Sequence, residues 1–145
     1  MFVFLFFGLL SVAGSYFLLA GTLNVDVFLP GISIGLLSSA VLNVNNTRDI
    51  ANDRQCGKHT LAARLGECKA KWLHTAMVTL AVGAAFWAAS LWSNGLRSYA
   101  FLLATPVLCW HVVQVWRLSG SQLNGQLKVL SLGTLLFGML LSLGG

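Results

Sequence analysis

The stretch from Asn45 to Gly66, NNTRDIANDRQCGKHTLAARLG, is the polar connection of an otherwise hydrophobic chain. It holds four of the 9 basic residues and two of the 4 acidic residues. Across all 145 residues, 57% are hydrophobic and 9% are charged, whereas about a quarter of the residues in a soluble domain are charged. The composition therefore predicts an integral membrane protein, and this stretch divides its membrane-spanning segments into two groups.

Five apolar segments are long enough to cross a membrane, since a spanning helix needs roughly 20 mainly apolar residues. They lie at about 1–20, 27–44, 72–93, 98–116 and 126–143. The connections between them are short except for the loop 45–71, so neighbouring spans are expected to run antiparallel. The predicted fold class is an all-α integral membrane domain over residues 1–145 with five transmembrane helices. In the second span, Gly31 and Gly35 favour close packing against another helix of this chain.

The basic residues predict the orientation of these helices. Only Arg97 falls on the side opposite the long loop. The other Lys and Arg residues fall on the loop side: Arg48, Arg54, Lys58, Arg64, Lys69, Lys71, Arg117 and Lys128. Basic residues concentrate on the cytoplasmic side of membrane proteins, so the loop is expected to be cytoplasmic. Topology also explains the net charge of +5, and no nucleic-acid partner is expected.

Three polar residues of the loop share a spacing of four. Asn45, Asp49 and Asp53 would lie along one face of a helix. Two carboxylates so close repel each other by a few tenths of a kcal/mol, and a divalent cation removes that repulsion. Mg²⁺ commonly takes one or two protein carboxylates and completes its octahedron with water and phosphate oxygens. Asp49 and Asp53 are therefore predicted to hold Mg²⁺, with Asn45 beside them.

Basic residues surround the two carboxylates. Arg48, Arg54 and Lys58 are the side chains expected to contact an anion, because Arg forks onto phosphate oxygens and Lys acts as a point charge. This mixture of signs favours a metal with a diphosphate over a metal alone. A second interpretation stays open, in which the stretch is a solvated cytoplasmic loop and Asp49 and Asp53 only balance Arg48 and Arg54.

The order of these residues resembles a known family motif. The run Asn-Asn-x-Arg-Asp-Ile-x-x-Asp-x-x-x-Gly-Lys-x-Thr-Leu, followed by Leu-Gly, is similar to the second aspartate-rich motif of the UbiA-type membrane prenyltransferases. Within that superfamily it is most similar to the enzymes that prenylate 1,4-dihydroxy-2-naphthoate in menaquinone synthesis. The resemblance covers the whole chain.

The resemblance implies a bundle of nine transmembrane helices, with one aspartate-rich motif after the second helix and another after the sixth. The motif in this chain follows the second predicted span, so the five spans would form the second part of that bundle. Only Asp26 and Glu67 remain as other acids, and neither is a candidate for the first motif. The N-terminal half of the enzyme is therefore expected to be missing and to be a required partner.

For the complete enzyme, the resemblance implies transfer of a polyprenyl group from polyprenyl diphosphate to 1,4-dihydroxy-2-naphthoate. The ring loses its carboxylate as CO₂, and the product is demethylmenaquinone. Mg²⁺ would be the cofactor, and a bacterial inner membrane the location. Asp49 and Asp53 would be the catalytic, metal-holding residues. The residues implied in diphosphate binding are Arg48, Lys58, Asn45 and Arg54.

Two alternatives remain. The chain could be a non-enzymatic membrane subunit whose charged loop docks a cytoplasmic protein, or it could belong to a prenyltransferase that uses a different aromatic acceptor. In the main interpretation, the isolated chain is expected to be inactive without the missing N-terminal half.

Overall fold

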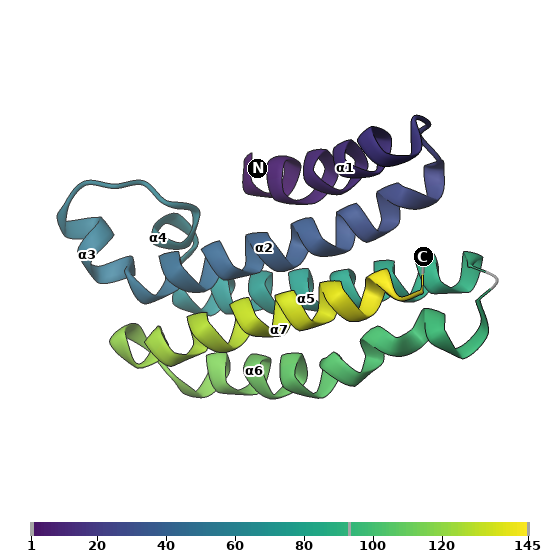
Figure 1. Ribbon diagram of the computed structural model, residues 1–145. Helices are drawn as coiled ribbons and strands as arrows, with labels where there is room; N and C mark the ends of the chain where they lie inside the picture. The colour runs from purple at the N-terminus through teal and green to yellow at the C-terminus, as the bar shows by residue number, and fades with distance from the viewer. Residues whose placement is uncertain (1, 93, 145) are drawn as a thin grey trace.

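The computed structural model describes residues 2–92 and 94–144, and every regular element within them is a helix (Figure 1). This confirms the expected all-α fold. Three expected boundaries lie outside the described residues. They are the start of the first span at Met1, the end of the third span at Ser93 and the end of the domain at Gly145. The elements are η1 (Phe4–Leu10), α1 (Ser11–Ala20), η2 (Val25–Val27), α2 (Phe28–Arg48), α3 (Ile50–Gln55), α4 (Leu61–Leu65), α5 (Glu67–Leu91), η3 (Gly95–Ala104), α6 (Thr105–Arg117), η4 (Gly120–Leu123) and α7 (Asn124–Ser142).

Four continuous helical segments are long and apolar enough to cross a membrane. They are Phe28–Arg48, Glu67–Leu91, Gly95–Arg117 and Gly120–Ser142. The segment Phe4–Ala20, formed by η1 and α1, is also apolar but shorter. Among the described residues, four of the five expected segments are therefore long enough to span a membrane. The count of five transmembrane helices stays a prediction.

Consecutive long helices run antiparallel (Figure 1), and their connections are short except for the one between α2 and α5, which holds α3 and α4. Helix α2 packs against η1 on one side and against α5 and α7 on others. Helix α7 also contacts α6 and η3. Because α2 touches so much of the bundle, its C-terminal end is held in a fixed position, and the polar stretch continues from that end into α3 and α4.

The first two helices meet through glycines. A Cβ atom added to Gly8 would lie 2.5 Å from Cα of Gly35, and one added to Gly35 would lie 2.8 Å from the carbonyl oxygen of Phe4. Real Cβ contacts are essentially never shorter than 3.0 Å. Gly31 faces the same neighbour at looser spacing. The predicted close intrachain packing at Gly31 and Gly35 is therefore confirmed, and Gly8 is the partner in the first helix.

Large apolar side chains fill the centre and also cover the outside. Phe101 and Phe137 are fully buried and lie edge to face, with ring centroids 5.3 Å apart. On the outer surface, Leu19 is 90% exposed and Leu103 is 74% exposed. A soluble monomer rarely exposes large apolar patches, whereas lipid tails cover exposed apolar side chains without cost. The surface thus agrees with a protein that crosses a membrane several times.

Candidate functional site

The motif begins inside α2, which continues beyond residue 44 and ends at Arg48. The helix breaks at Asp49, where φ is −95° and ψ is 7°, and α3 follows. The backbone N–H of Asp49 still donates to the carbonyl of Asn45 at 3.2 Å, and that of Asp53 donates to the carbonyl of Asp49 at 2.8 Å. Asn45, Asp49 and Asp53 therefore keep helical spacing across the break.

The carboxylate of Asp49 is paired with its neighbour in the chain. Nε of Arg48 donates to Oδ1 at 2.8 Å, and the NH2 nitrogen donates to Oδ2 at 2.7 Å. These two hydrogen bonds hold the pKa of the Asp49 carboxyl below its usual range. The side chains of Arg48 and Asp49 are 24% and 33% exposed. Arg48 and Asp49 thus form a bidentate ion pair that is partly exposed, so a ligand can reach both side chains.

Asp53 is enclosed by the turn that follows it. Its residue surface is 5% exposed. The hydroxyl of Thr60 donates to Oδ2 of Asp53 at 3.2 Å, and Nζ of Lys58 lies 4.0 Å from Oδ1. The turn closes at Gly57, whose φ of +68° is a left-handed conformation that favours glycine. Lys58 is 64% exposed at its side chain, so its pairing with Asp53 is loose and leaves the ammonium available.

Arg54 has a different partner from the other basic residues of the motif. Its Nε and NH2 nitrogens donate to the carbonyl oxygen of Ala63 at 3.2 and 3.0 Å. This contact ties α3 to α4. Asn45 is half-buried on α2. The predicted roles of Arg54 and Asn45 in diphosphate binding stay predictions.

Two residues outside the predicted set contact it. Thr60 caps α4, since its Oγ1 accepts from the backbone N–H of Ala63 at 3.3 Å, in addition to its bond to Asp53. A threonine before a short apolar helical segment is a sequence signal for an N-cap. Asn124, the first residue of α7, accepts from the NH1 nitrogen of Arg48 at 2.9 Å. No local pattern could have indicated this contact.

A buried lysine fixes the turn between α6 and α7. Nζ of Lys71 donates to the carbonyl oxygen of Leu118 at 2.8 Å and lies 2.7 Å from Oε1 of Glu67. The hydroxyl of Ser119 donates to the same Glu67 carboxylate. Ser119 also forms a capping box with Gln122 at the start of η4. The beginning of α7, which carries Asn124, is therefore anchored to α5.

A second buried polar group lies among α5, α6 and α7. The rings of His74 and His111 pack edge to face with centroids 5.0 Å apart, and both residues are fully buried. Nδ1 of His111 lies 2.8 Å from Oε1 of Gln126. Within residues 2–92 and 94–144, no hydrogen bond joins these three side chains to Asp49 or Asp53. They therefore link helices of the bundle and are separate from the motif site.

The side chains of the motif fit a magnesium ion that takes some of its ligands from the protein and the others from a substrate and water. Within residues 2–92 and 94–144, no group of three or more His, Cys, Asp and Glu side chains lies close enough to form a metal cage. Two carboxylates, Asp49 and Asp53, are what Mg²⁺ takes when phosphate oxygens and water complete its coordination. In this structure the guanidinium of Arg48 donates to Asp49, and the hydroxyl of Thr60 donates to Asp53.

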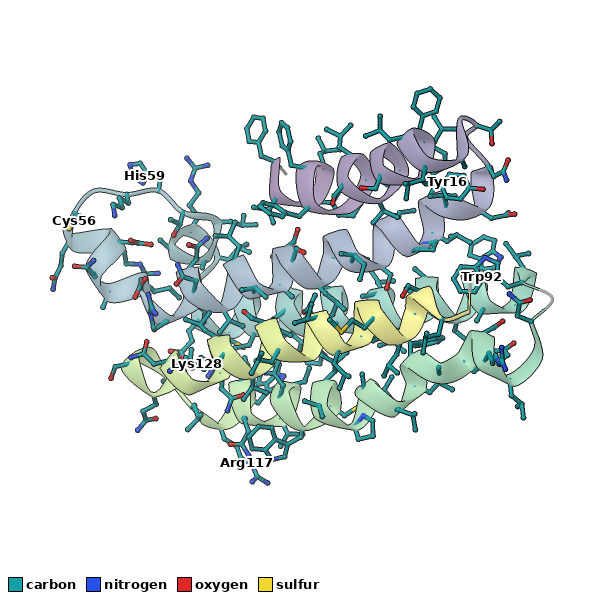
Figure 2. All side chains as sticks on the ribbon, viewed as in Figure 1. Tyr16, Cys56, His59, Trp92, Arg117 and Lys128 are labelled. Atoms are coloured by element: carbon teal, nitrogen blue, oxygen red, sulfur yellow. The ribbon has the colours of Figure 1, made fainter. Side chains whose placement is uncertain are left out.

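A cavity of about 530 Å³ lies at the other end of the helices, where Tyr16 and Trp92 line it (Figure 2). Its walls are mainly apolar, and Asp26 is the one acidic residue among the described residues that line it. Pro30 also lines it, and at 1.5 Å per residue Pro30 and Arg48 are about 27 Å apart along α2. Figure 2 shows Cys56 and His59 of the motif turn at the opposite end from Tyr16. This cavity is therefore not part of the motif site.

Known proteins are similar to this chain along most of its length. A protein from Haemophilus influenzae (strain ATCC 51907 / DSM 11121 / KW20 / Rd), named 1,4-dihydroxy-2-naphthoate octaprenyltransferase, is 41% identical over 98% of this chain and 46% of its own length. A protein of the same name from Escherichia coli (strain K12) is 47% identical over 73% of this chain and 34% of its own length. The chain thus spans less than half the length of these relatives. No solved structure matches it significantly.

The comparison with family models agrees with these relatives. The model of the UbiA prenyltransferase family matches residues 1–137, which include the whole motif and all four helical segments of span length except the end of the last. The resemblance seen in the motif is confirmed at the level of the family. This chain belongs to the UbiA prenyltransferase family.

Proposed function

We propose that this chain supplies the second aspartate-rich motif of a membrane enzyme that transfers a polyprenyl group to 1,4-dihydroxy-2-naphthoate. The observation that carries the proposal is the gathering of two carboxylates and two cations, Asp49, Asp53, Arg48 and Lys58, at the end of α2 in a chain of this family. The names of the relatives support the acceptor and the polyprenyl donor.

In the proposed reaction, Asp49 and Asp53 would hold Mg²⁺. The ion, when bound, supplies positive charge that stabilises the departing diphosphate. Arg48 and Lys58 contact the phosphate oxygens, where negative charge develops as the allylic bond breaks, and preorganised donors there lower the barrier most. Asn45 and Arg54 are proposed as further contacts to the diphosphate. The naphthoate ring then attacks the allylic carbon as the bond to diphosphate breaks, and it loses its carboxylate as CO₂. The product is the quinol form of demethylmenaquinone, because both ring hydroxyls stay reduced.

The proposed topology follows from the same assignment. The chain forms the last five of nine transmembrane helices, counting Phe4–Ala20 as the first of the five. The motif end faces the cytoplasm of a bacterial cell, and the protein lies in the inner membrane. The part of the enzyme that corresponds to the rest of the relatives supplies the first motif. Prenyl transfer therefore requires that part, and the 145-residue chain alone is inactive.

The test is a chimera in which this chain replaces the corresponding segment of the Haemophilus influenzae relative. The chimera is expected to convert polyprenyl diphosphate and 1,4-dihydroxy-2-naphthoate into the quinol form of demethylmenaquinone, with release of CO₂ and diphosphate, in the presence of Mg²⁺. Asp49→Asn and Asp53→Asn are each expected to reduce turnover at least a hundredfold. Asp26→Asn is the matched control, because this aspartate lies at the other end of the helices.

Two outcomes would contradict the proposal in different ways. Turnover near that of the unmodified chimera in Asp49→Asn or Asp53→Asn would overturn the metal assignment. Product formed only with an aromatic acceptor other than the naphthoate would overturn the acceptor and leave the prenyl-transfer chemistry in place.

A further inference from the structure

The guanidinium of Arg48 is held from two sides. Its Nε and NH2 nitrogens donate to the two carboxylate oxygens of Asp49, at 2.8 and 2.7 Å. Its NH1 nitrogen donates to Oδ1 of Asn124 at 2.9 Å. Asn124 lies 76 positions further along the chain, so this contact joins the end of α2 to the start of α7. All three nitrogens of the guanidinium are therefore engaged within the protein.

Asn124 is a fixed anchor for this contact. It begins α7 directly after η4, and η4 is closed by the capping box of Ser119 and Gln122. Lys71 of α5 binds the carbonyl of Leu118 just before that turn. Arg48 is at the end of a helix that packs against much of the bundle. The guanidinium thus sits between two well-held backbones, and within the ion pair the side chain of Asp49 is more exposed than that of Arg48.

This arrangement places a cation where a metal ion would have to bind. A cation that binds Asp49 on the side that faces Arg48 replaces at least one hydrogen bond from the guanidinium. A cation at either oxygen also brings a second positive charge beside the guanidinium. The donors that Arg48 gives up then need an anion. A diphosphate supplies such an anion, because its oxygens accept the planar fork of an arginine as a carboxylate does.

We propose that Arg48, positioned by Asn124, blocks Asp49 until a divalent cation and a diphosphate arrive together. The diphosphate takes over the donors of Arg48 that the metal displaces, so the two ligands bind synergistically. Asn124 is a positioning residue: it keeps the guanidinium beside the site after its bonds to Asp49 break, by holding the nitrogen that faces away from Asp49. This inference rests on the proposed function, because it requires Asp49 to hold a metal ion.

Mn²⁺ binding measured by electron paramagnetic resonance tests the proposal without relying on turnover. The 145-residue chain is placed in lipid nanodiscs, and Mn²⁺ affinity is measured with and without inorganic pyrophosphate. Mn²⁺ binding that remains in the Asp53→Asn variant is subtracted as background, because this variant lacks one of the two proposed metal-holding carboxylates. In the unmodified chain, pyrophosphate is expected to raise Mn²⁺ affinity at least tenfold. Circular dichroism establishes that each variant keeps its helical content.

Three variants separate the parts of the inference. In Arg48→Met, Mn²⁺ alone is expected to bind several-fold more tightly, and the effect of pyrophosphate is expected to fall below threefold. Arg48→Lys keeps the charge but not the fork, and its pyrophosphate effect is expected to lie in between. Asn124→Ala is expected to lose at least half of the synergy, whereas Ser121→Ala, an exposed residue of the same turn, is expected to keep it.

The outcomes distinguish this inference from the proposed function. An equal pyrophosphate effect in the unmodified chain and in Arg48→Met would overturn the synergy while leaving the metal assignment intact. Equal synergy in Asn124→Ala and Ser121→Ala would overturn the role of Asn124. Mn²⁺ binding with pyrophosphate that does not differ between the helical unmodified chain and Asp53→Asn would overturn the metal assignment and this inference together.

Discussion

The hydroxyl of Thr60 lies 3.2 Å from Oδ2 of Asp53, so the residue that caps α4 also binds the buried acid of the motif. The same Oγ1 accepts from the backbone N–H of Ala63 at 3.3 Å. One side chain therefore fixes both the start of a helix and the direction of a carboxylate. The turn between α3 and α4 is in this way part of the site.

Thr60→Val tests this double role. Valine keeps the shape of threonine but removes the donor to Asp53 and the cap of α4. Loss of an N-cap costs about 1 kcal/mol, and the buried carboxylate of Asp53 loses a hydrogen bond as well. The chimeric enzyme is expected to melt at a lower temperature and to need more Mg²⁺ for half-maximal activity. Thr60→Ser keeps the hydroxyl and is expected to behave like the unmodified protein; equal Mg²⁺ dependence in the two variants would contradict the contact.

The ion pair of Arg48 and Asp49 predicts a pH dependence of stability. The pKa of Asp49 is lowered in the folded protein by the two hydrogen bonds from Arg48, whereas an unfolded Asp titrates near about 3.9. A group with a lowered folded pKa stabilises the fold above its unfolded pKa, and this contribution is lost as the pH falls through its folded pKa. The stability difference between the unmodified protein and Asp49→Asn is therefore expected to shrink in strong acid.

Thermal unfolding in detergent between pH 7 and pH 2.5 measures that difference. Asp26→Asn serves as the control, since this aspartate lies at the far end of the helices. A difference for Asp49→Asn that stays constant down to the lowest pH would contradict the lowered pKa.

Sequence reasoning predicted the features of this protein that are local. The hydropathy of the chain predicted its helices. The four-residue spacing of Asp49 and Asp53 predicted helical geometry, and the backbone N–H of Asp53 does donate to the carbonyl of Asp49. The alternative interpretation of the loop anticipated that Asp49 meets Arg48, but it paired Asp53 with Arg54. Asp53 instead meets Lys58 and Thr60. Arg48 contacts Asn124 76 positions away, and such a pairing depends on how α2 and α7 pack. Arg54 faces the carbonyl of Ala63 because α3 and α4 fold onto each other, which charge patterns do not indicate.

The same limit applied to the glycines. The spacing of Gly31 and Gly35 predicted a close helix contact, but the partner Gly8 has no regular spacing to either of them along the chain. Among the described residues, the first apolar segment, Phe4–Ala20, also falls short of the length of the four spans. Hydropathy alone marks an apolar segment, whereas the helix ends depend on backbone hydrogen bonds, such as the one from Gly21 N–H to the Phe17 carbonyl.

Gly35→Ala is predicted to separate the first two helices. Its new Cβ would lie 2.8 Å from the carbonyl oxygen of Phe4, which is backbone and does not move alone. Overpacking of this kind costs about 1–3 kcal/mol. Gly83→Ala is the matched control, because a Cβ there meets nothing within 4 Å, and alanine favours a helix by about 0.5–1 kcal/mol over glycine. Thermal unfolding should show opposite shifts for the two variants; equal shifts would contradict the contact.

Lys71→Met is predicted to loosen the turn that carries Asn124. The ammonium of Lys71 is the donor to the Leu118 carbonyl at 2.8 Å, and the lysine is 6% exposed. Its removal leaves that carbonyl without its charged donor and Glu67 without its cation, and hydrogen bonds to charged groups contribute about 1.5–3 kcal/mol. Lys69→Met, two positions earlier on the exposed side of α5, controls for the loss of one positive charge. Hydrogen exchange at the backbone amides of η4 and the first turn of α7 is expected to accelerate in Lys71→Met and not in Lys69→Met. Unchanged exchange in both variants would show that η4 holds Asn124 through its own capping box, without help from α5.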